Sequence, residues 1–212
     1  MSTTDTARYP VPAAEHRVRD EVQRSRFLTV LAPAPTIEAA QAVVAAVRAE
    51  FPEATHHCWA HVVGPPGSTA RIGLSDDGEP HGTAGRPMLT ALLHSGVGDI
   101  VAVVVRWYGG TKLGTGGLAR AYAGGVTSAL ATLPTRDRVA RTTLSLRVAH
   151  ADVGAVRQLL AAHEATLVDE AYGAEVRYVV AVPTAARAAL EGALRDATRG
   201  TAVIREADAP TG

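Results

Sequence analysis

Lys112 is the only lysine in a chain that carries twenty arginines, and it lies in the glycine-rich segment 109-GGTKLGTGG-117. Arg106 precedes this segment and Arg120 follows it, and no acidic residue lies between positions 100 and 136. Glycines adopt positive φ easily and leave their amide N–H groups uncovered by side chains. Cations and free amides in one loop favour an anion, so we predict that this loop binds one.

The residues after the loop have the apolar spacing of a helix, with Leu118, Tyr122 and Val126 on one side. The loop would therefore lead into a helix N-terminus, which carries a partial positive charge. The segment is not a Walker A motif, because no Gly-Lys-Ser/Thr is present, and it lacks the acidic residue of a dinucleotide-binding fingerprint. The structural alternative is that the glycines only let a strand and a helix pack closely.

A second segment, 75-SDDGEPHGTAG-85, contains three carboxylates, those of Asp76, Asp77 and Glu79, and the imidazole of His81. Asp-Asp-Gly favours a tight turn, in which exposed carboxylates cost nothing. The alternative is a metal or general-base site. We favour the turn, because a Mg²⁺ site usually draws its carboxylates from several elements.

Thirteen of the twenty glycines lie between positions 73 and 125. Ordinary turns would spread them more evenly, so we expect the loops 75–86 and 106–117 to converge on one surface. The anion-binding residues expected there are Arg86, Arg106, Gly109, Gly110, Lys112, Gly114, Gly116, Gly117 and Arg120. Their expected acidic and polar partners are His56, Asp76, Asp77 and Glu79.

His56, His57, Cys58 and His61 together suggest a zinc site, but the geometry of a strand argues against it. His57 and His61 would share a face yet lie ~13 Å apart, too far to chelate one ion. His56 and Cys58 share the other face, and two ligands do not complete a site. We expect no metal and no cofactor, and we expect Cys58 not to act as a nucleophile.

The chain has 212 residues, 47% of them hydrophobic, and its 21 acidic and 21 basic residues cancel. This balance excludes a globally basic nucleic-acid coat, so any contact with nucleic acid must be local. No apolar run approaches the ~20 residues of a membrane helix, and the start lacks an apolar signal-peptide centre. A single cysteine fits a reducing compartment. We expect a cytoplasmic protein without a membrane partner.

Periodicity gives the elements that must position the loops. Thr36 is a good N-cap for a helix that Phe51-Pro52 ends, and Asp99–Trp107 is apolar on both faces, as expected of a central strand. Further strands are expected within 16–32, at 55–63 and at 69–75, and further helices at 83–95 and directly after the glycine loop.

The pattern changes after Leu133, and residues 142–206 read as strand, helix, two strands, helix and strand. This βαββαβ order is the ferredoxin-like arrangement, so we expect an α+β protein. The expected division is a flexible tail (1–14), a first domain (15–134), a linker (135–141), a ferredoxin-like domain (142–207) and a tail (208–212). The second domain lacks any reactive cluster.

Four motifs of the chain resemble the YigZ/IMPACT family of small proteins. They are Ser-Arg-Phe at 25–27, HHCWA at 56–60, SDDGEPHGTAGRP at 75–87 and RWYGGTKLGTGGLARAY at 106–122, in the right order and spacing. His57, His81 and Trp107-Tyr108 depart from the usual residues without disturbing Lys112 or the loop glycines. The resemblance implies a ribosomal protein S5 domain 2-like α/β sandwich, followed by a domain similar to the late domains of elongation factor G.

The resemblance implies a function only in outline. Eukaryotic relatives are linked to control of translation initiation through a protein regulator, bacterial ones are suspected to bind nucleic acid or the ribosome, and no agreed reaction attaches to the family. We therefore expect a non-enzymatic binding protein that contacts RNA or the translation apparatus. Two alternatives stay open: an enzyme or sensor for a phosphorylated ligand that uses the carboxylates at 76–79, and a regulator that binds only proteins.

Overall fold

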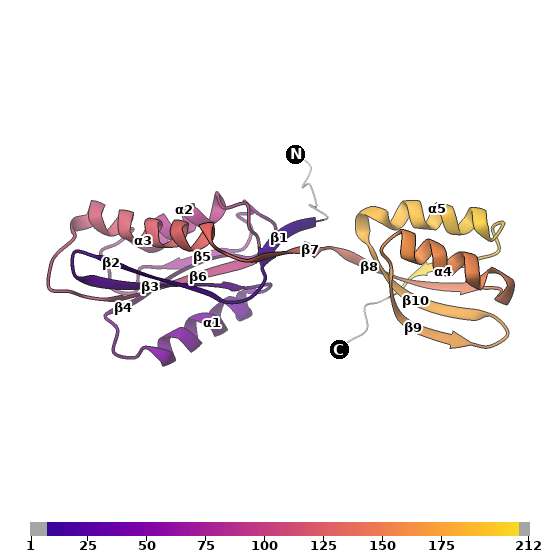
Figure 1. Ribbon diagram of the computed structural model, residues 1–212, viewed down its shortest axis with the longest axis horizontal. Helices are drawn as coiled ribbons and strands as arrows, with labels where there is room; N and C mark the ends of the chain where they lie inside the picture. The colour runs from indigo at the N-terminus through magenta and orange to yellow at the C-terminus, as the bar shows by residue number, and fades with distance from the viewer. Residues whose placement is uncertain (1–7, 208–212) are drawn as a thin grey trace. The chain divides into compact units, whose positions relative to one another are not determined.

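The computed structural model describes residues 8–207 of a chain with two compact units, Met1–Arg138 and Val139–Gly212 (Figure 1). The first unit contains β1 (Arg8–Pro12), β2 (His16–Val22), β3 (Ser25–Pro33), α1 (Ile37–Glu50), β4 (His56–Val62), β5 (Ile72–Ser75), α2 (Gly85–Leu93), β6 (Ile100–Trp107) and α3 (Gly114–Ala131). Strand β7 (Thr135–Val139) reaches the boundary. No helix within 8–207 is both long and apolar enough to cross a bilayer.

The first unit is built on a five-stranded antiparallel sheet in the order β2-β3-β6-β4-β5. Strand β6 lies at its centre, and every residue from Ile100 to Arg106 is buried. The prediction of a central strand apolar on both faces is therefore confirmed. A strand buried on both faces needs a layer of other elements on each side.

Helix α1 covers one face of this sheet, and α2 and α3 cover the other (Figure 1). Val44 and Val47 of α1 pack with Val103 of the sheet, whereas Met88 of α2 and Tyr122 of α3 belong to the opposite core. Successive side chains of a strand point to opposite faces. The side chains of the last two residues of β6 therefore lie on opposite faces of the sheet: Arg106 faces α2 and α3, and Trp107 faces α1.

Helix α1 begins and ends as the sequence predicts. The Thr36 hydroxyl accepts a hydrogen bond from the Ala39 N–H at 3.1 Å, which satisfies one of the unpaired amides of the first turn. The helix ends at Glu50, just before Phe51-Pro52. Helix α2 holds Pro87 in its first turn, where proline's missing N–H costs nothing.

The second unit is a four-stranded antiparallel sheet in the order β11-β8-β10-β9. Its elements are β8 (Arg141–Val148), the turn η1 (His150–Asp152), α4 (Val153–Ala162), β9 (Thr166–Tyr172), β10 (Val176–Pro183), the turn η2 (Thr184–Ala186), α5 (Arg187–Ala197) and β11 (Val203–Glu206). Leu146, Tyr178 and Leu190 lie in its core. The predicted order of elements is confirmed, and the chain is a mixed α+β protein.

Two segments expected to lack structure form strands. Residues 8–12 of the expected tail form β1, which pairs with β7 in a two-stranded sheet and buries Tyr9 and Val11. Residues 135–139 of the expected linker form β7. The remainder of the tail, 1–7, and the tail at 208–212 lie outside the described residues. Strand β1 was not predicted because it contains two prolines, which cannot donate to a ladder and are confined to edge strands. Strand β7 was not predicted because its residues are mostly charged or polar and lack apolar alternation.

Asp99 fastens this two-stranded sheet to the first unit. Its buried carboxylate accepts hydrogen bonds from the Tyr9 hydroxyl at 2.8 Å and the Gly64 N–H at 2.8 Å, and it forms an ion pair with Arg138. Burial, followed by the hydrogen bond to Asp99, raises the pKa of Tyr9 to about 12. Tyr9 therefore stays protonated and keeps donating to Asp99 near neutral pH.

Candidate functional site

Asp76 caps helix α2 from outside the helix. Its Oδ1 accepts hydrogen bonds from the N–H groups of Ala84 at 3.0 Å and Gly85 at 2.8 Å, and its Oδ2 accepts one from Gly82 at 2.7 Å. Burial alone would raise the pKa of Asp76, but these three backbone donors outweigh it and hold the pKa below its usual range. The carboxylate is thus committed to the amides at the start of α2.

Asp77 is likewise committed to the fold. Its Oδ1 pairs with Arg48 at 2.6 Å and its Oδ2 accepts the backbone N–H of His57 at 2.7 Å. The residue has a φ of 43° and precedes Gly78, whose φ is 85°, as in a tight turn. The expected turn is present, and it brings the Asp77 carbonyl within 2.8 Å of His56 Nδ1, which donates to it.

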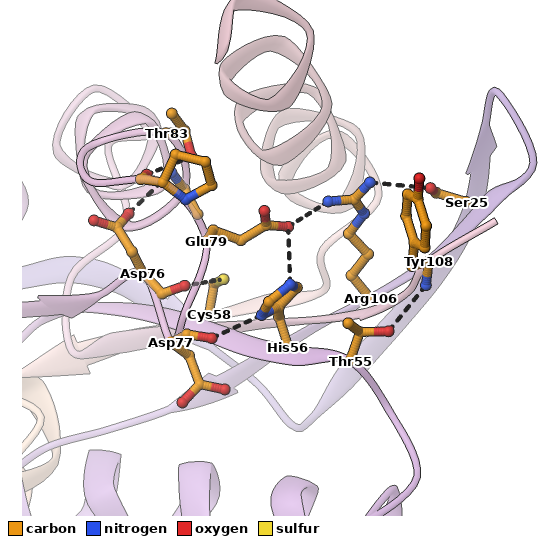
Figure 2. Close-up of polar contacts among 12 residues, drawn as sticks. Ser25, Thr55, His56, Cys58, Asp76, Asp77, Glu79, Thr83, Arg106 and Tyr108 are labelled. Carbon is orange, nitrogen blue, oxygen red and sulfur yellow. Dashed lines mark hydrogen bonds and ion pairs between the residues drawn. The ribbon is translucent and has the colours of Figure 1, made fainter. Parts of the chain in front are cut away.

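Glu79 was expected to lie in an exposed turn, but its carboxylate is buried (Figure 2). Its Oε1 accepts hydrogen bonds from Arg106 Nη1 at 2.6 Å and from the Tyr122 hydroxyl at 2.8 Å. His56 Nε2 lies 3.9 Å from the same oxygen. Glu79 enters the interior because a buried carboxylate with a cation and a hydroxyl beside it is compensated for the loss of water.

Arg106 is as buried as its partner, with 4% of its surface exposed. Its Nη2 donates to the Ser25 hydroxyl at 3.1 Å, and the guanidinium carbon lies 5.5 Å and 5.6 Å from the ring centres of Phe27 and Tyr108. Its Nε is buried and has no hydrogen-bond partner within the described chain. The charge of Arg106 is therefore balanced by Glu79, while one of its N–H groups stays unpaired.

The side chains of β4 alternate between the two faces of the sheet. Cys58 lies under the site and donates its S–H to the Asp76 carbonyl at 3.0 Å, and burial raises the pKa of its thiol to about 12. A thiol at neutral pH is a poor nucleophile. His61, on the other face, stacks on Trp59 with ring centres 5.6 Å apart, and burial lowers its pKa.

The histidines and carboxylates do not gather around a common point. His57 Nε2 donates to the Phe51 carbonyl at 2.9 Å. Within residues 8–207, no three His, Cys, Asp or Glu side chains are grouped closely enough to hold a metal ion.

Burial raises the pKa of Tyr122, so its hydroxyl remains protonated and donates to Glu79.

The glycine loop leads from β6 into α3. A Cβ on Gly109 would lie 1.9 Å from the Arg24 carbonyl oxygen, so only glycine allows this close approach to the turn between β2 and β3. Gly110 and Gly114 have positive φ. Leu113 stands at the N-cap of α3 and gives no side-chain cap. The first amides of α3 therefore have neither an intrahelical partner nor a side-chain acceptor.

The two glycine-rich loops meet at a pocket of about 350 Å³. Glu79, Arg106 and Lys112 line it together with the first turn of α3. The complete lining is Glu79, Pro80, Arg106, Tyr108, Lys112, Leu113, Gly114, Thr115 and Leu118. We call this the loop pocket. Its floor is the buried Glu79–Arg106 pair, and Lys112 is exposed at its edge.

The remaining expected residues lie around the loop pocket rather than in it. Arg86 lines a separate hollow with Asp76 and His81. Gly116, Gly117 and Arg120 belong to α3 but do not line the pocket, and neither do Gly109 and Gly110. Sequence reasoning missed Tyr108, Thr115, Ser25 and Tyr122. Tyr108 could have been found, because it lies two residues beyond Arg106 and so on the same face.

A larger pocket of about 500 Å³ lies on the α1 side of the sheet, at the same end of β6. Phe51 and Trp107 form its apolar wall, with ring centres 5.5 Å apart, and Arg26 lies 5.3 Å above the Trp107 ring. Glu53 accepts the Trp107 indole N–H at 3.1 Å. We call this the Trp107 pocket. Its lining holds the cations of Arg19 and Arg26 together with the carboxylates of Asp20, Glu21 and Glu53, so it is not selective for an anion.

Comparison with known proteins covers both units. Residues 23–130 match the family model of the Impact N-terminal domain, and residues 146–201 match a domain of unknown function, DUF1949. A crystal structure described as that of a hypothetical protein has a TM-score of 0.70 and 44% identity, and the match covers 95% of this chain and 98% of that one.

Two curated bacterial relatives match over almost their whole length. IMPACT family member YigZ of Escherichia coli K12 is 46% identical over 191 residues, which cover 90% of this chain and 94% of the relative. An IMPACT family member of Haemophilus influenzae is 39% identical over 199 residues, covering 94% and 97%. The motifs at 25–27, 56–60, 75–87 and 106–122 all lie within the matched residues 23–130, and the chain belongs to the IMPACT family.

Proposed function

We propose that this protein binds RNA without catalysing a reaction, holding a backbone phosphate in the loop pocket. The observation that carries the proposal is the meeting of Lys112 with the uncapped N-terminus of α3 in one pocket. Amides at a helix N-terminus and a nearby ammonium are a ready site for an anion.

The charges of the pocket support an anion. Glu79 and Arg106 neutralise each other at 2.6 Å, so Lys112 is left as the unbalanced charge in the lining. Contacts from amides and a lysine to phosphate position a nucleic-acid backbone without reading its sequence. Asp76 and Asp77 are held by α2, Arg48 and His57, which makes an enzyme that uses them as base or metal ligands the weaker alternative.

Membership of the IMPACT family fits a regulatory role without catalysis. We extend this to contact with the translation apparatus in the cytoplasm, with RNA, the ribosome or a protein regulator of translation as the partner. The anion-binding pocket supports the first two partners more than the third, because a purely protein-binding surface has no need of a phosphate cradle.

The test is binding of a fluorescent single-stranded RNA of roughly 20 nucleotides over a range of salt concentrations. Lys112→Ala should weaken binding and reduce the log–log salt slope by about 0.7, as expected for one lost phosphate contact on a single strand. Arg71→Ala, which removes an exposed cation that does not line the loop pocket, is the matched control. Equal affinity and slope in wild type and Lys112→Ala would refute the proposal.

We also propose the finer folds and domains. An antiparallel sheet whose strands run 4-1-3-2 in chain order supports a ferredoxin-like second domain, and the sheet with helices on both faces supports a ribosomal S5 domain 2-like first domain. Limited proteolysis between the units should release a folded fragment of roughly the first 135 residues. A single resistant core without a cut near 134–141 would contradict separate domains.

A further inference from the structure

We propose that the open face of the sheet in the second unit binds the backbone of base-paired RNA. This face lies opposite to α4 and α5, which Figure 1 shows together on one side of the sheet. We call it the arginine face, after Arg147, Arg177 and Arg205. The inference goes beyond the proposed function, because it assigns a second surface and a double-stranded ligand to a unit that contributes nothing to the lining of the loop pocket.

The alternation of side chains along each strand places the three arginines on one face. Leu146 of β8 and Tyr178 of β10 pack into the core beneath the helices. Successive side chains of a strand point to opposite faces, so Arg147 and Arg177 project from the other side of the sheet. Arg205 of β11 shares this face, because its register partner in β8 lies two residues from Arg147. All three arginines are exposed.

The register sets two of these cations directly opposite each other. Arg147 pairs with Arg177 across β8 and β10, the two central strands of the sheet. Like charges in directly opposite positions destabilise a sheet. Arg205 is the diagonal neighbour of Arg147, at the spacing of about 7–8 Å that such positions have. A ligand with several closely spaced negative charges, such as a phosphate backbone, offsets this repulsion.

The carboxylates of the second unit do little to balance the arginine face. Residues 139–207 contain eight arginines and eight acidic residues, so the unit as a whole is balanced. On the arginine face, Asp169 pairs with Arg177 at 3.4 Å, but both side chains are more than half exposed, and such a pair contributes little. Arg147 and Arg205 have no hydrogen bond or ion pair with any described residue. Three other carboxylates pair instead with arginines of α4 and α5.

The surface between the arginines fits a paired nucleic acid better than a protein or a single strand. Its described residues include Ser145, Val179 and Ala181, and it carries no aromatic ring, since Tyr172 pairs with Val176 and lies on the helix side. Protein interfaces are anchored by aromatic residues and have few charges at their centre. Single strands are held by rings on which their bases stack. The bases of a duplex are paired, so its backbone needs only the cations.

The shape of the face favours RNA over DNA. B-DNA is read by a helix or a two-stranded ribbon that enters its grooves, and a broad four-stranded sheet does not fit there. The minor groove of an RNA duplex is wide and shallow, and it displays 2′-hydroxyls beside the phosphates. Arginines hold phosphates through two parallel hydrogen bonds, and the hydroxyls of Thr143 and Ser145 on the same face can donate to or accept from a ribose.

The experiment measures binding of the full chain to a fluorescent RNA duplex of roughly 20 base pairs over a range of salt concentrations. Arg147→Gln with Arg177→Gln should weaken binding about tenfold or more and reduce the log–log salt slope by about 1.8, as expected for two lost phosphate contacts. Arg157→Gln with Arg195→Gln, which removes two exposed arginines from the helices, is the matched control and should keep the wild-type slope. The melting temperature of the first variant should not fall, because the substitution relieves a like-charge pair.

The outcomes separate this inference from the proposed function. The ratio of duplex to single-strand affinity should fall in Arg147→Gln with Arg177→Gln and rise in Lys112→Ala. Failure of wild type to bind the duplex, or an unchanged slope in the first variant, overturns the arginine face whatever Lys112→Ala does to single strands. Equal affinity of wild type for a DNA duplex of the same sequence overturns the assignment to RNA. An equal loss of duplex binding in the control variant overturns the assignment to this face.

Discussion

The two glycine-rich loops look alike in sequence, but the structure uses their charged groups in opposite ways. The loop at 75–85 directs its carboxylates inward, where Asp76 holds three amides and Glu79 holds Arg106 and Tyr122. The loop at 109–117 uses its glycines for close approach and positive φ, and it leaves Lys112 and the first amides of α3 unpaired within the described chain. The first loop builds the pocket floor, and the second leaves its rim open to a ligand.

The largest expected effect tests the buried floor. Glu79→Ala leaves the Arg106 guanidinium buried without its counter-charge, and we expect a loss of about 3–5 kcal/mol in the free energy of unfolding. Urea denaturation followed by circular dichroism measures it. Glu21→Ala, which removes an exposed carboxylate from β2, should change stability by less than about 0.5 kcal/mol. Equal stability of the two variants would mean that the Glu79–Arg106 pair does not hold the loop.

Asp76 should show a smaller effect with a distinct pH dependence. Asp76→Ala leaves the amides of Gly82, Ala84 and Gly85, at and just before the start of α2, without their acceptor and should cost about 1–3 kcal/mol at pH 7. The folded-state pKa of Asp76 is lowered, so its contribution is present above the ordinary value of about 3.9 and is lost as pH falls toward the folded pKa. Stability measured between about pH 4 and pH 2 should therefore fall less steeply in Asp76→Asn than in wild type. Parallel curves would contradict this assignment.

The smallest effect is expected in the open loop. Lys112→Ala, the variant expected to lose RNA affinity, should change the free energy of unfolding by less than about 0.5 kcal/mol, because the side chain is exposed. Thermal denaturation alongside Glu79→Ala makes the comparison direct. A sharp fall in the melting temperature of Lys112→Ala with unchanged RNA binding would contradict this comparison. It would show that Lys112 stabilises the fold rather than binding a ligand.

Much of the fold could be predicted because its signals are local. The Thr36 cap, the stop at Phe51-Pro52 and the doubly apolar β6 each lie within a few residues of the element that they define. The site could be predicted only in part. Lys112 stood out by composition, but the burial of Glu79 depends on Arg106 and Tyr122, 27 and 43 residues away, and no short-range pattern carries that information.

Asp99 also constrains the order in which the molecule can assemble. Tyr9 precedes its carboxylate partner by 90 residues, and Arg138 follows it by 39. During synthesis the start of the chain leaves the ribosome long before Asp99 exists, so β1 has no anchor until β6 is made. Its other partner, β7, arrives later still. Closure of the first unit therefore comes late in translation, and a nascent chain halted before Arg138 would keep Tyr9 without its complete anchor.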